Sequence, residues 1–239
     1  MGLEFNKRLT MAFQPIVDLA GESVFAHEAL VRGPQGEGAP RVLVNVGSGE
    51  GYAFDQQCRQ TAIRLAERLH LPETTANLSI NFSPGIVRDP LDSLAKTFNM
   101  AEHARLPLER IIFECRDTKW LDVAHTIEVL SAYRAAGVRT GLDNFGPTAA
   151  SLELLSKFQP DFVKIDMRLV RNIDTDAAKR RVVKRALGWF RDLDIRPICG
   201  GVETHGEFAA LTDLGVGLLQ GYLFARPAFE QLATPRLRA

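Results

Sequence analysis

The sequence predicts an α/β protein built as a closed (β/α)8 barrel whose first two strands form an antiparallel hairpin. Two apolar, strand-like segments, residues 12–19 and 24–32, are joined by a turn too short to hold a crossover helix. The rest of the chain alternates helical and strand patterns, which indicates parallel strands with right-handed crossovers. Roughly eight strands in a chain of this length favour a closed barrel over an open sheet.

The elements after the hairpin follow from their periodicity and their breakers. Residues 34–50 are rich in loop-forming residues, and a helix is expected over residues 52–70, where Leu71 and Pro72 end it. The later strands are expected at residues 77–82, 110–114, 140–146, 161–166, 196–199 and 216–220. The later helices are expected at residues 91–104, 120–136, 149–157, 177–193 and 206–214.

Composition narrows the class of protein. The 239 residues are 46% hydrophobic and contain no low-complexity linker, so we expect one domain spanning residues 1–239. The 29 basic residues balance 29 acidic ones, which gives no indication of a nucleic-acid polymer or a membrane as partner. Cys58, Cys115 and Cys199 have no metal-site spacing and are expected to be reduced thiols. With no long apolar run, the chain is expected to be soluble and cytoplasmic.

Polar side chains stand at the ends of the predicted strands. In a barrel these ends meet at one mouth, where burying so much polarity is costly unless a cation or an anionic ligand compensates it. Their oxygens suit a hard cation, and a lysine stands among them. The sequence therefore predicts a metal site able to activate water against a phosphodiester. The residues are Gln14, Glu28, Asn81, Glu114, Asp143, Asn144, Lys164 and Gln220.

Several ordered motifs resemble those of the EAL domain family, the cyclic-di-GMP phosphodiesterase module. The matching segments are residues 14–16, 28–32, 79–84, 161–166, 201–204 and 220–227. This resemblance covers nearly the whole chain and implies a barrel of the EAL type, modified by its antiparallel first hairpin. It also implies hydrolysis of cyclic-di-GMP to linear pGpG with Mg²⁺ or Mn²⁺.

The resemblance assigns roles to individual residues. It implies that Lys164 lies beside the attacking water and the scissile phosphate. The metal ligands it implies are Glu28, Asn81, Glu114, Asp143 and, weakened, Asn144. The contacts to the nucleotide that it implies are Gln14, Leu30, Arg32, Asp55 and Gln220, with Arg32 suited to a phosphate oxygen.

The chain departs from the family pattern at catalytic positions. Asn144 replaces an aspartate that helps to hold the second metal, and Gly200 stands where active members place a catalytic glutamate. Glu203 is the doubtful substitute for that glutamate, and Asp117 shortens another acid. Losing a general base costs about 10²–10⁴-fold in rate. We therefore expect a weakened or single metal site and a catalytically impaired regulator that binds cyclic-di-GMP or a protein partner.

Other interpretations stay open at this point. The chain is alternatively an active phosphodiesterase in which Glu203 or Asn144 suffices, or an interaction scaffold with a vestigial pocket. A homodimer is possible. A remote alternative comes from the glycine-rich residues 42–51, which look like the loop of an S-adenosylmethionine-dependent methyltransferase. Such a loop needs an acid at the end of the next strand, and the next strand here ends at residues 81–83 without one.

Overall fold

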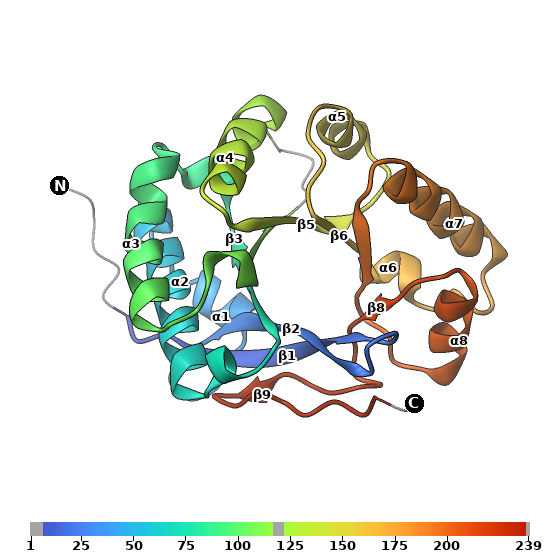
Figure 1. Cartoon of the computed structure of the whole chain (residues 1–239), viewed down its shortest axis with the longest axis horizontal. Coiled ribbons are helices and arrows are strands. Elements are labelled where there is room, and N and C mark those ends of the chain that lie inside the picture. The colour runs from blue at the N-terminus through green and yellow to red at the C-terminus, as the bar shows by residue number, and fades with distance from the viewer. Residues whose placement is uncertain (1–6, 117–121, 238–239) are drawn as a thin grey trace.

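Eight strands close into a barrel with helices packed around its outside (Figure 1). This computed structural model describes residues 7–116 and 122–237. The strands run in the order β2-β3-β4-β5-β6-β7-β8-β1, and β1 also pairs with β2, which closes the ring. The predicted barrel is confirmed.

The strands lie close to their predicted positions. Their bounds are β1 Thr10–Asp18, β2 Ser23–Arg32, β3 Asn77–Phe82, β4 Ile111–Arg116, β5 Arg139–Phe145, β6 Phe162–Ile165, β7 Arg196–Cys199, β8 Leu218–Leu219 and β9 Ala228–Phe229. The helices are α1 Ala39–Leu43, α2 Gly51–Arg68, α3 Pro90–His103, α4 Val123–Ala135, α5 Ala149–Lys157, α6 Met167–Val170, α7 Ala177–Asp192 and α8 His205–Asp213. Short 3-10 turns occur at Leu71–Glu73, Pro84–Ile86 and Leu108–Arg110.

The first strand reverses the direction of the barrel locally. β1 is antiparallel to β2 and to β8, whereas the pairs from β2 to β8 are parallel. The short turn between β1 and β2 requires this, because a parallel pair needs a long crossover. The predicted antiparallel hairpin is therefore confirmed, and β2 delivers its carboxyl end to the same mouth as β3 to β8.

Side-chain caps define where several helices begin. Thr148 and Thr204 each start a helix with a reciprocal capping box, at α5 and α8. Asp89 and Asp176 accept hydrogen bonds from the first turns of α3 and α7. These caps hold the loops that follow the strands, and those loops surround the mouth of the barrel.

The core has two layers on the two sides of the sheet. The larger layer packs between strands and helices, and includes Phe113, Tyr133 and Phe190. The smaller one includes Ile112, Phe162 and Ile198, each of which lies two positions before a residue of the predicted site. Because alternate residues of a strand share a face, these apolar side chains fill the barrel interior directly below that site. They keep water away from the lower side of the polar cluster.

Three elements differ from the sequence predictions. The segment 34–50 was expected to be a loop but contains the helix α1. The helix α6 and the strand β9 were also not predicted. All three elements are so short that they leave little periodicity to detect. The expected helix start at residue 120, and Asp117, lie outside the described residues.

The glycine-rich residues 42–51 begin in α1 instead of following a strand, so the geometry of a methyltransferase loop is missing there. Within the described ranges, none of the helices is both long and apolar enough to cross a bilayer.

Candidate active site

Polar residues from five strands or strand ends meet at the mouth of the barrel. They surround a cavity of about 230 Å³. The lining side chains and backbone belong to Gln14, Glu28, Asp143, Asn144, Lys164, Ile165, Met167, Gly200, Gly201, Glu203, Gln220, Gly221 and Tyr222. The sequence prediction that polar strand ends converge agrees with this placement.

The ammonium of Lys164 lies at the centre of the carboxylates. Its Nζ is 3.0 Å from Glu28 Oε2, 2.5 Å from Glu114 Oε2 and 4.0 Å from Asp143 Oδ1. All four side chains are nearly or completely buried. One internal cation thus balances three acids that come from β2, β4 and β5.

Amide side chains hold Glu28 in place. Asn81 donates to Glu28 Oε1 at 2.8 Å, and Gln220 donates to Glu28 Oε2 at the same distance. Ser79 donates to Glu114, and Gln14 donates to the carbonyl oxygen of Ala225 at 3.1 Å. Each of the two buried glutamates therefore has a neutral hydrogen-bond donor in addition to Lys164, which fixes its rotamer.

A glycine in β5 makes room for Glu114. Gly141 pairs with Glu114 across the sheet, and a Cβ atom at position 141 would lie 3.2 Å from the Glu114 Cγ. That distance is too close for ordinary packing, so a larger residue would push the carboxylate out of position. The glycine in the segment 140–146 thus has a steric role in the site.

Burial and neighbouring charges shift the pKa values of the site residues in different directions. Burial raises the pKa of Glu114 to about 7 despite its contact with Lys164. Burial also acts to raise the pKa of Glu28, but Lys164 and the amides of Gln220 and Asn81 outweigh it and leave that pKa lowered. Burial raises the pKa of Asp143. Burial disfavours the charged lysine, yet the surrounding carboxylates hold the pKa of Lys164 above its usual range.

The donor chemistry of this cluster fits a hard divalent cation. Three carboxylates already converge within 4.0 Å on a single positive charge, and the Lys164 ammonium stands in for the charge of a metal. Carboxylate and amide oxygens are the ligands that Mg²⁺ and Mn²⁺ prefer. Within residues 7–116 and 122–237, no three His, Cys, Asp or Glu side chains form a ready-made metal cluster. The lysine lies between the acids, so a metal ion requires the ammonium to move aside.

Mn²⁺ is expected to bind more tightly at pH 8 than at pH 6. Glu114, with a pKa of about 7, must release its proton before it can ligate a cation, which gives about a tenfold difference in affinity across this range. Titration calorimetry at both pH values, in buffers of different ionisation enthalpy, measures the affinity and the released proton. An affinity that is equal at the two pH values would contradict this prediction.

The folding stability of the metal-free protein should fall as the pH rises, whereas the affinity for Mn²⁺ should increase. The folded pKa of Glu114, about 7, lies above the ordinary value of 4.5 for a glutamate, so the folded chain holds the extra proton. Its contribution to stability is complete below about pH 4.5 and is lost as the pH rises through 7.

Gly200 lies in the cavity wall at the end of β7. A Cβ atom there would lie 3.6 Å from Lys164 Cδ and 3.7 Å from Gln220 Oε1, which are ordinary contact distances. A side chain at this position would therefore enter the cavity without a clash. The neighbouring Gly201 differs, because its φ of +79° and a 2.6 Å approach to Met167 exclude a side chain.

Glu203 also lines the cavity, but its carboxylate is engaged elsewhere. Glu203 Oε1 lies 2.6 Å from Arg171 Nη2, and the side chain is 37% exposed. The hydrogen bond to Arg171 lowers the pKa of Glu203. A carboxylate that is paired in this way is a weaker base.

Asn144 adopts a left-handed backbone conformation with φ of 57°. Asparagine and aspartate both tolerate this region, because their short side chains hydrogen-bond locally. This backbone geometry is therefore accessible to aspartate as well as asparagine, and Asn144 differs from an aspartate by carrying no negative charge.

Three predicted nucleotide contacts lie outside this cavity. Asp55 is buried and lies 2.6 Å from Arg59 Nε, and it accepts a hydrogen bond from the backbone N–H of Ser83 at 3.3 Å. Arg32 donates to the carbonyl oxygen of Val31 at 2.8 Å, and Leu30 is half-buried at the end of β2. In the part of the chain that the structure describes, these residues are not part of the cavity lining.

Sequence reasoning missed other residues of the site. Arg171 follows the short helix α6, where nothing in the pattern indicates a partner for Glu203. Tyr222 lines the cavity, and the Arg226 guanidinium lies 4.2 Å from its ring centroid. Tyr222 lies two residues after Gln220, so its place in the motif at residues 220–227 was the available signal.

Solved structures with the same fold include ligand-bound proteins. One is a standalone versatile EAL protein from Vibrio cholerae O395 in its c-di-GMP-bound form. It is 41% identical, with a TM-score of 0.93, over 98% of each chain. Another is Klebsiella pneumoniae BlrP1 in a manganese and cyclic-di-GMP complex, 30% identical with a TM-score of 0.88, over 98% of this chain and 60% of that one.

Curated relatives are similar at lower identity. The blue light- and temperature-regulated antirepressor BluF of Escherichia coli is 30% identical over 90% of this chain, and the match covers 53% of BluF. The cyclic di-GMP phosphodiesterase NbdA of Pseudomonas aeruginosa is 28% identical over 93% of this chain and 29% of NbdA. The chain thus spans about half or less of the length of these relatives. The family model for the EAL domain matches residues 4–227, and the chain belongs to the EAL domain family.

Proposed function

We propose that this chain is a cyclic-di-GMP-binding regulator in which hydrolysis of the nucleotide is slow or absent. The observation that carries this proposal is Gly200, which contributes no carboxylate at the point of the cavity wall where a Cβ atom would contact Lys164 Cδ and Gln220 Oε1. A general base must lie within hydrogen-bond reach of the water it activates. Glu203, the nearest substitute in the motif, is paired with Arg171.

The metal-binding part of the site supports retained binding. Glu28, Asn81, Glu114 and Asp143 would hold Mg²⁺ or Mn²⁺, while Asn144 would contribute a weaker, neutral oxygen. When bound, such an ion polarises a phosphate oxygen and lowers the pKa of water. Lys164 would then be released from the carboxylates and would bind the phosphate or orient the water. A weakened or single metal site follows from the missing charge at Asn144.

Two of the five proposed nucleotide contacts line this cavity, and the other three lie outside it. Gln14 and Gln220 lie in the cavity wall, and Arg32 is suited to a phosphate oxygen. Leu30 remains a proposed apolar contact at the end of β2. Asp55 is proposed to meet a guanine only after its pairing with the buried Arg59 changes.

A regulator that works by binding has support from the relatives. BluF is named an antirepressor, whereas NbdA is named a phosphodiesterase. The EAL fold thus occurs in proteins with both kinds of name, and the residues at positions 144 and 200 favour the binding role for this chain.

Titration calorimetry with cyclic-di-GMP in Ca²⁺, and then in Mn²⁺, tests the proposal. The Mn²⁺ sample is afterwards run on a column to detect pGpG. We expect saturable binding in both ions and little or no product. Product at an ordinary turnover rate would make the chain an active phosphodiesterase, and an absence of binding would leave a protein-binding scaffold.

Glu203→Gln distinguishes the source of any residual hydrolysis. Because the Glu203 carboxylate is paired with Arg171, we expect its removal to change the trace rate by less than about twofold, far below the loss of a true general base. A loss of all product in this variant would show that Glu203 acts as the base.

A further inference from the structure

Helix α7 concentrates positive charge in a chain whose formal net charge is zero. Asp192, at its last position, is the one acidic residue in its sequence. Its basic residues are Lys179, Arg180, Arg181, Lys184, Arg185 and Arg191. This asymmetry produces a local positive electrostatic potential that cannot be recognised from the neutral composition of the chain.

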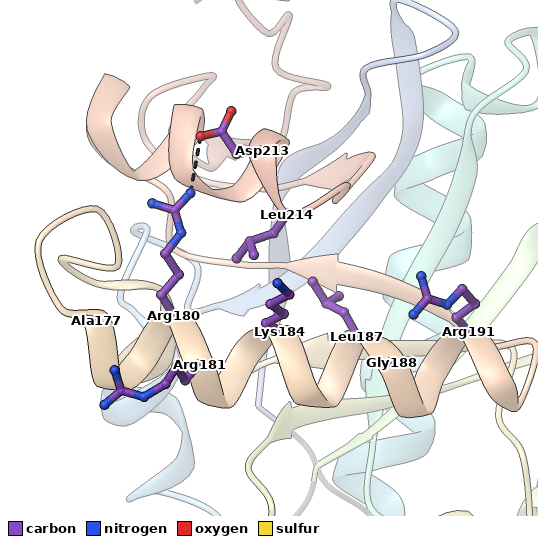
Figure 2. Close-up of a pocket in the computed structure, with 9 residues that line it drawn as sticks. All are labelled: Ala177, Arg180, Arg181, Lys184, Leu187, Gly188, Arg191, Asp213 and Leu214. Atoms are coloured by element: carbon purple, nitrogen blue, oxygen red, sulfur yellow. Dashed lines mark hydrogen bonds and ion pairs between the residues drawn. The ribbon is translucent and has the colours of Figure 1, made fainter.

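A groove runs between α7 and α8 on the outside of the barrel. It has a volume of about 510 Å³. In Figure 2, Arg180, Lys184 and Arg191 project from α7 on the side of α8, while Arg181 points away from it. Leu187 and Leu214 face each other across the floor of the groove. The groove is therefore apolar at its floor and basic along one wall.

Most of this basic wall has no partner inside the protein. Arg180 Nη2 lies 3.3 Å from Asp213 Oδ2, and the two side chains are 41% and 69% exposed. In the described part of the chain, the side chains of Lys184 and Arg191 form no hydrogen bond and no ion pair. Both residues are exposed, so their charges are available to a ligand.

Gly188 keeps the groove open. It lies in the groove lining, one turn after Lys184, and a Cβ atom added there would meet nothing within 4 Å. Glycine in the middle of a helix is destabilising relative to alanine. Helix α7 thus has a helix-destabilising residue at the point where a larger side chain would reduce the volume of the groove.

We propose that the α7–α8 groove is a docking site for an acidic segment of a partner protein that also inserts an aliphatic side chain. The cations Lys184 and Arg191 would pair with carboxylates, and the apolar side chain would cover Leu187 and Leu214. Asp213 at the rim and the apolar floor oppose a polyphosphate backbone, which would gain nothing from Leu187. A second copy of this chain would bring one basic helix against another in a twofold contact.

The dimensions of the groove suit a short peptide. From Ala177 to Arg191 the helix rises about 21 Å, which an extended segment of about six or seven residues spans. Lys184 and Arg191 are about 10.5 Å apart along the axis, so carboxylates three to four residues apart in an extended peptide would reach both.

Selection of phage-displayed random peptides against the whole protein provides the probe. We expect the selected peptides to be rich in Asp and Glu around one Leu or Ile. Their affinity, measured by fluorescence anisotropy with a labelled peptide, should fall about tenfold or more in Lys184→Glu/Arg191→Glu. The binding should also weaken as salt rises, because exposed charges are screened.

Two further variants separate specific docking from general electrostatics. Arg64→Glu/Lys96→Glu reverses two exposed charges on α2 and α3 and should leave the affinity within about twofold. Gly188→Phe fills the groove without a change in charge and should weaken binding about tenfold. An unaltered circular dichroism spectrum shows that each variant is folded.

Several outcomes would overturn the proposal. Selected peptides without acidic residues, or an affinity that is unchanged in Lys184→Glu/Arg191→Glu, would exclude an acidic ligand. Tighter binding of single-stranded DNA or of anionic vesicles than of the peptide would assign the charges to another class of partner. A wild-type dimer that becomes a monomer in the same variant would make the groove a contact between copies. The cavity at the barrel mouth shares no lining residue with the groove, so cyclic-di-GMP binding should be unaffected.

Discussion

Gly200→Glu combined with Asn144→Asp is expected to raise the rate of cyclic-di-GMP hydrolysis in Mn²⁺ by about 10²–10⁴-fold. At position 200 a Cβ atom makes only ordinary contacts, with Lys164 and Gln220, so the new glutamate would enter the cavity beside the lysine. At position 144 the left-handed backbone tolerates aspartate, which restores an anionic oxygen for the metal. The rate is measured as the initial rate of pGpG formation, with the product separated and quantified on a column.

The controls for this gain separate position from charge. Gly217→Glu adds a carboxylate in open space just before β8, at the opposite end of that strand from the cavity, and should leave the rate unchanged. Each single variant should recover less than the pair, because both groups stabilise one transition state. The informative negative result is a double variant that binds nucleotide and metal and still forms no more product than the wild type. That result would refute the proposal that hydrolysis is slow because positions 144 and 200 lack carboxylates.

Lys164→Met should destabilise the metal-free protein by about 3–5 kcal/mol. The substitution removes the cation that lies 3.0 Å from Glu28 and 2.5 Å from Glu114, and leaves their buried charges without compensation. Chemical denaturation at pH 7.5, followed by fluorescence, measures the loss. Lys157→Met removes an exposed i,i+4 pair with Glu153 and should cost only about 0.3–0.5 kcal/mol.

Metal and protons should both rescue the Lys164→Met variant. Mn²⁺ supplies the missing positive charge, so it should raise the melting temperature of the variant more than that of the wild type. Loss of Lys164 raises the pKa values of the acids around it, so the folded variant binds extra protons and gains stability as the pH falls from 8 towards 5. A variant as stable as the wild type, with no response to Mn²⁺ or pH, would show that Lys164 is not the counter-charge of this cluster.

Local features of the sequence were sufficient to predict the barrel. The turn between β1 and β2 is too short for a crossover, and the alternation of strands and helices leaves few ways to connect them. Glu28, Glu114, Asp143 and Lys164 could be placed together because strand ends in a barrel share one mouth. This prediction needed only the strand boundaries and the two-residue alternation of side chains.

Side-chain partners in loops were beyond such reasoning. Glu203 was a candidate base from its place in a motif, but its carboxylate pairs with Arg171, which comes from the segment after α6. Asp55 was a candidate for guanine recognition, but in the fold it is buried against Arg59. In both cases the direction of a side chain depends on a neighbour that no periodic pattern identifies.

The sequence by itself determined the order of strands and helices, the hairpin at the start, and the presence of Asn144 and Gly200 at positions where the family resemblance predicts carboxylates. These depend on residue type, local periodicity and turn length. Only the tertiary structure decided that Lys164 balances three acids and that α7 and α8 enclose a basic groove. The physical reason is distance along the chain, because Lys164 meets Glu28 across 136 positions and Arg180 meets Asp213 across 33.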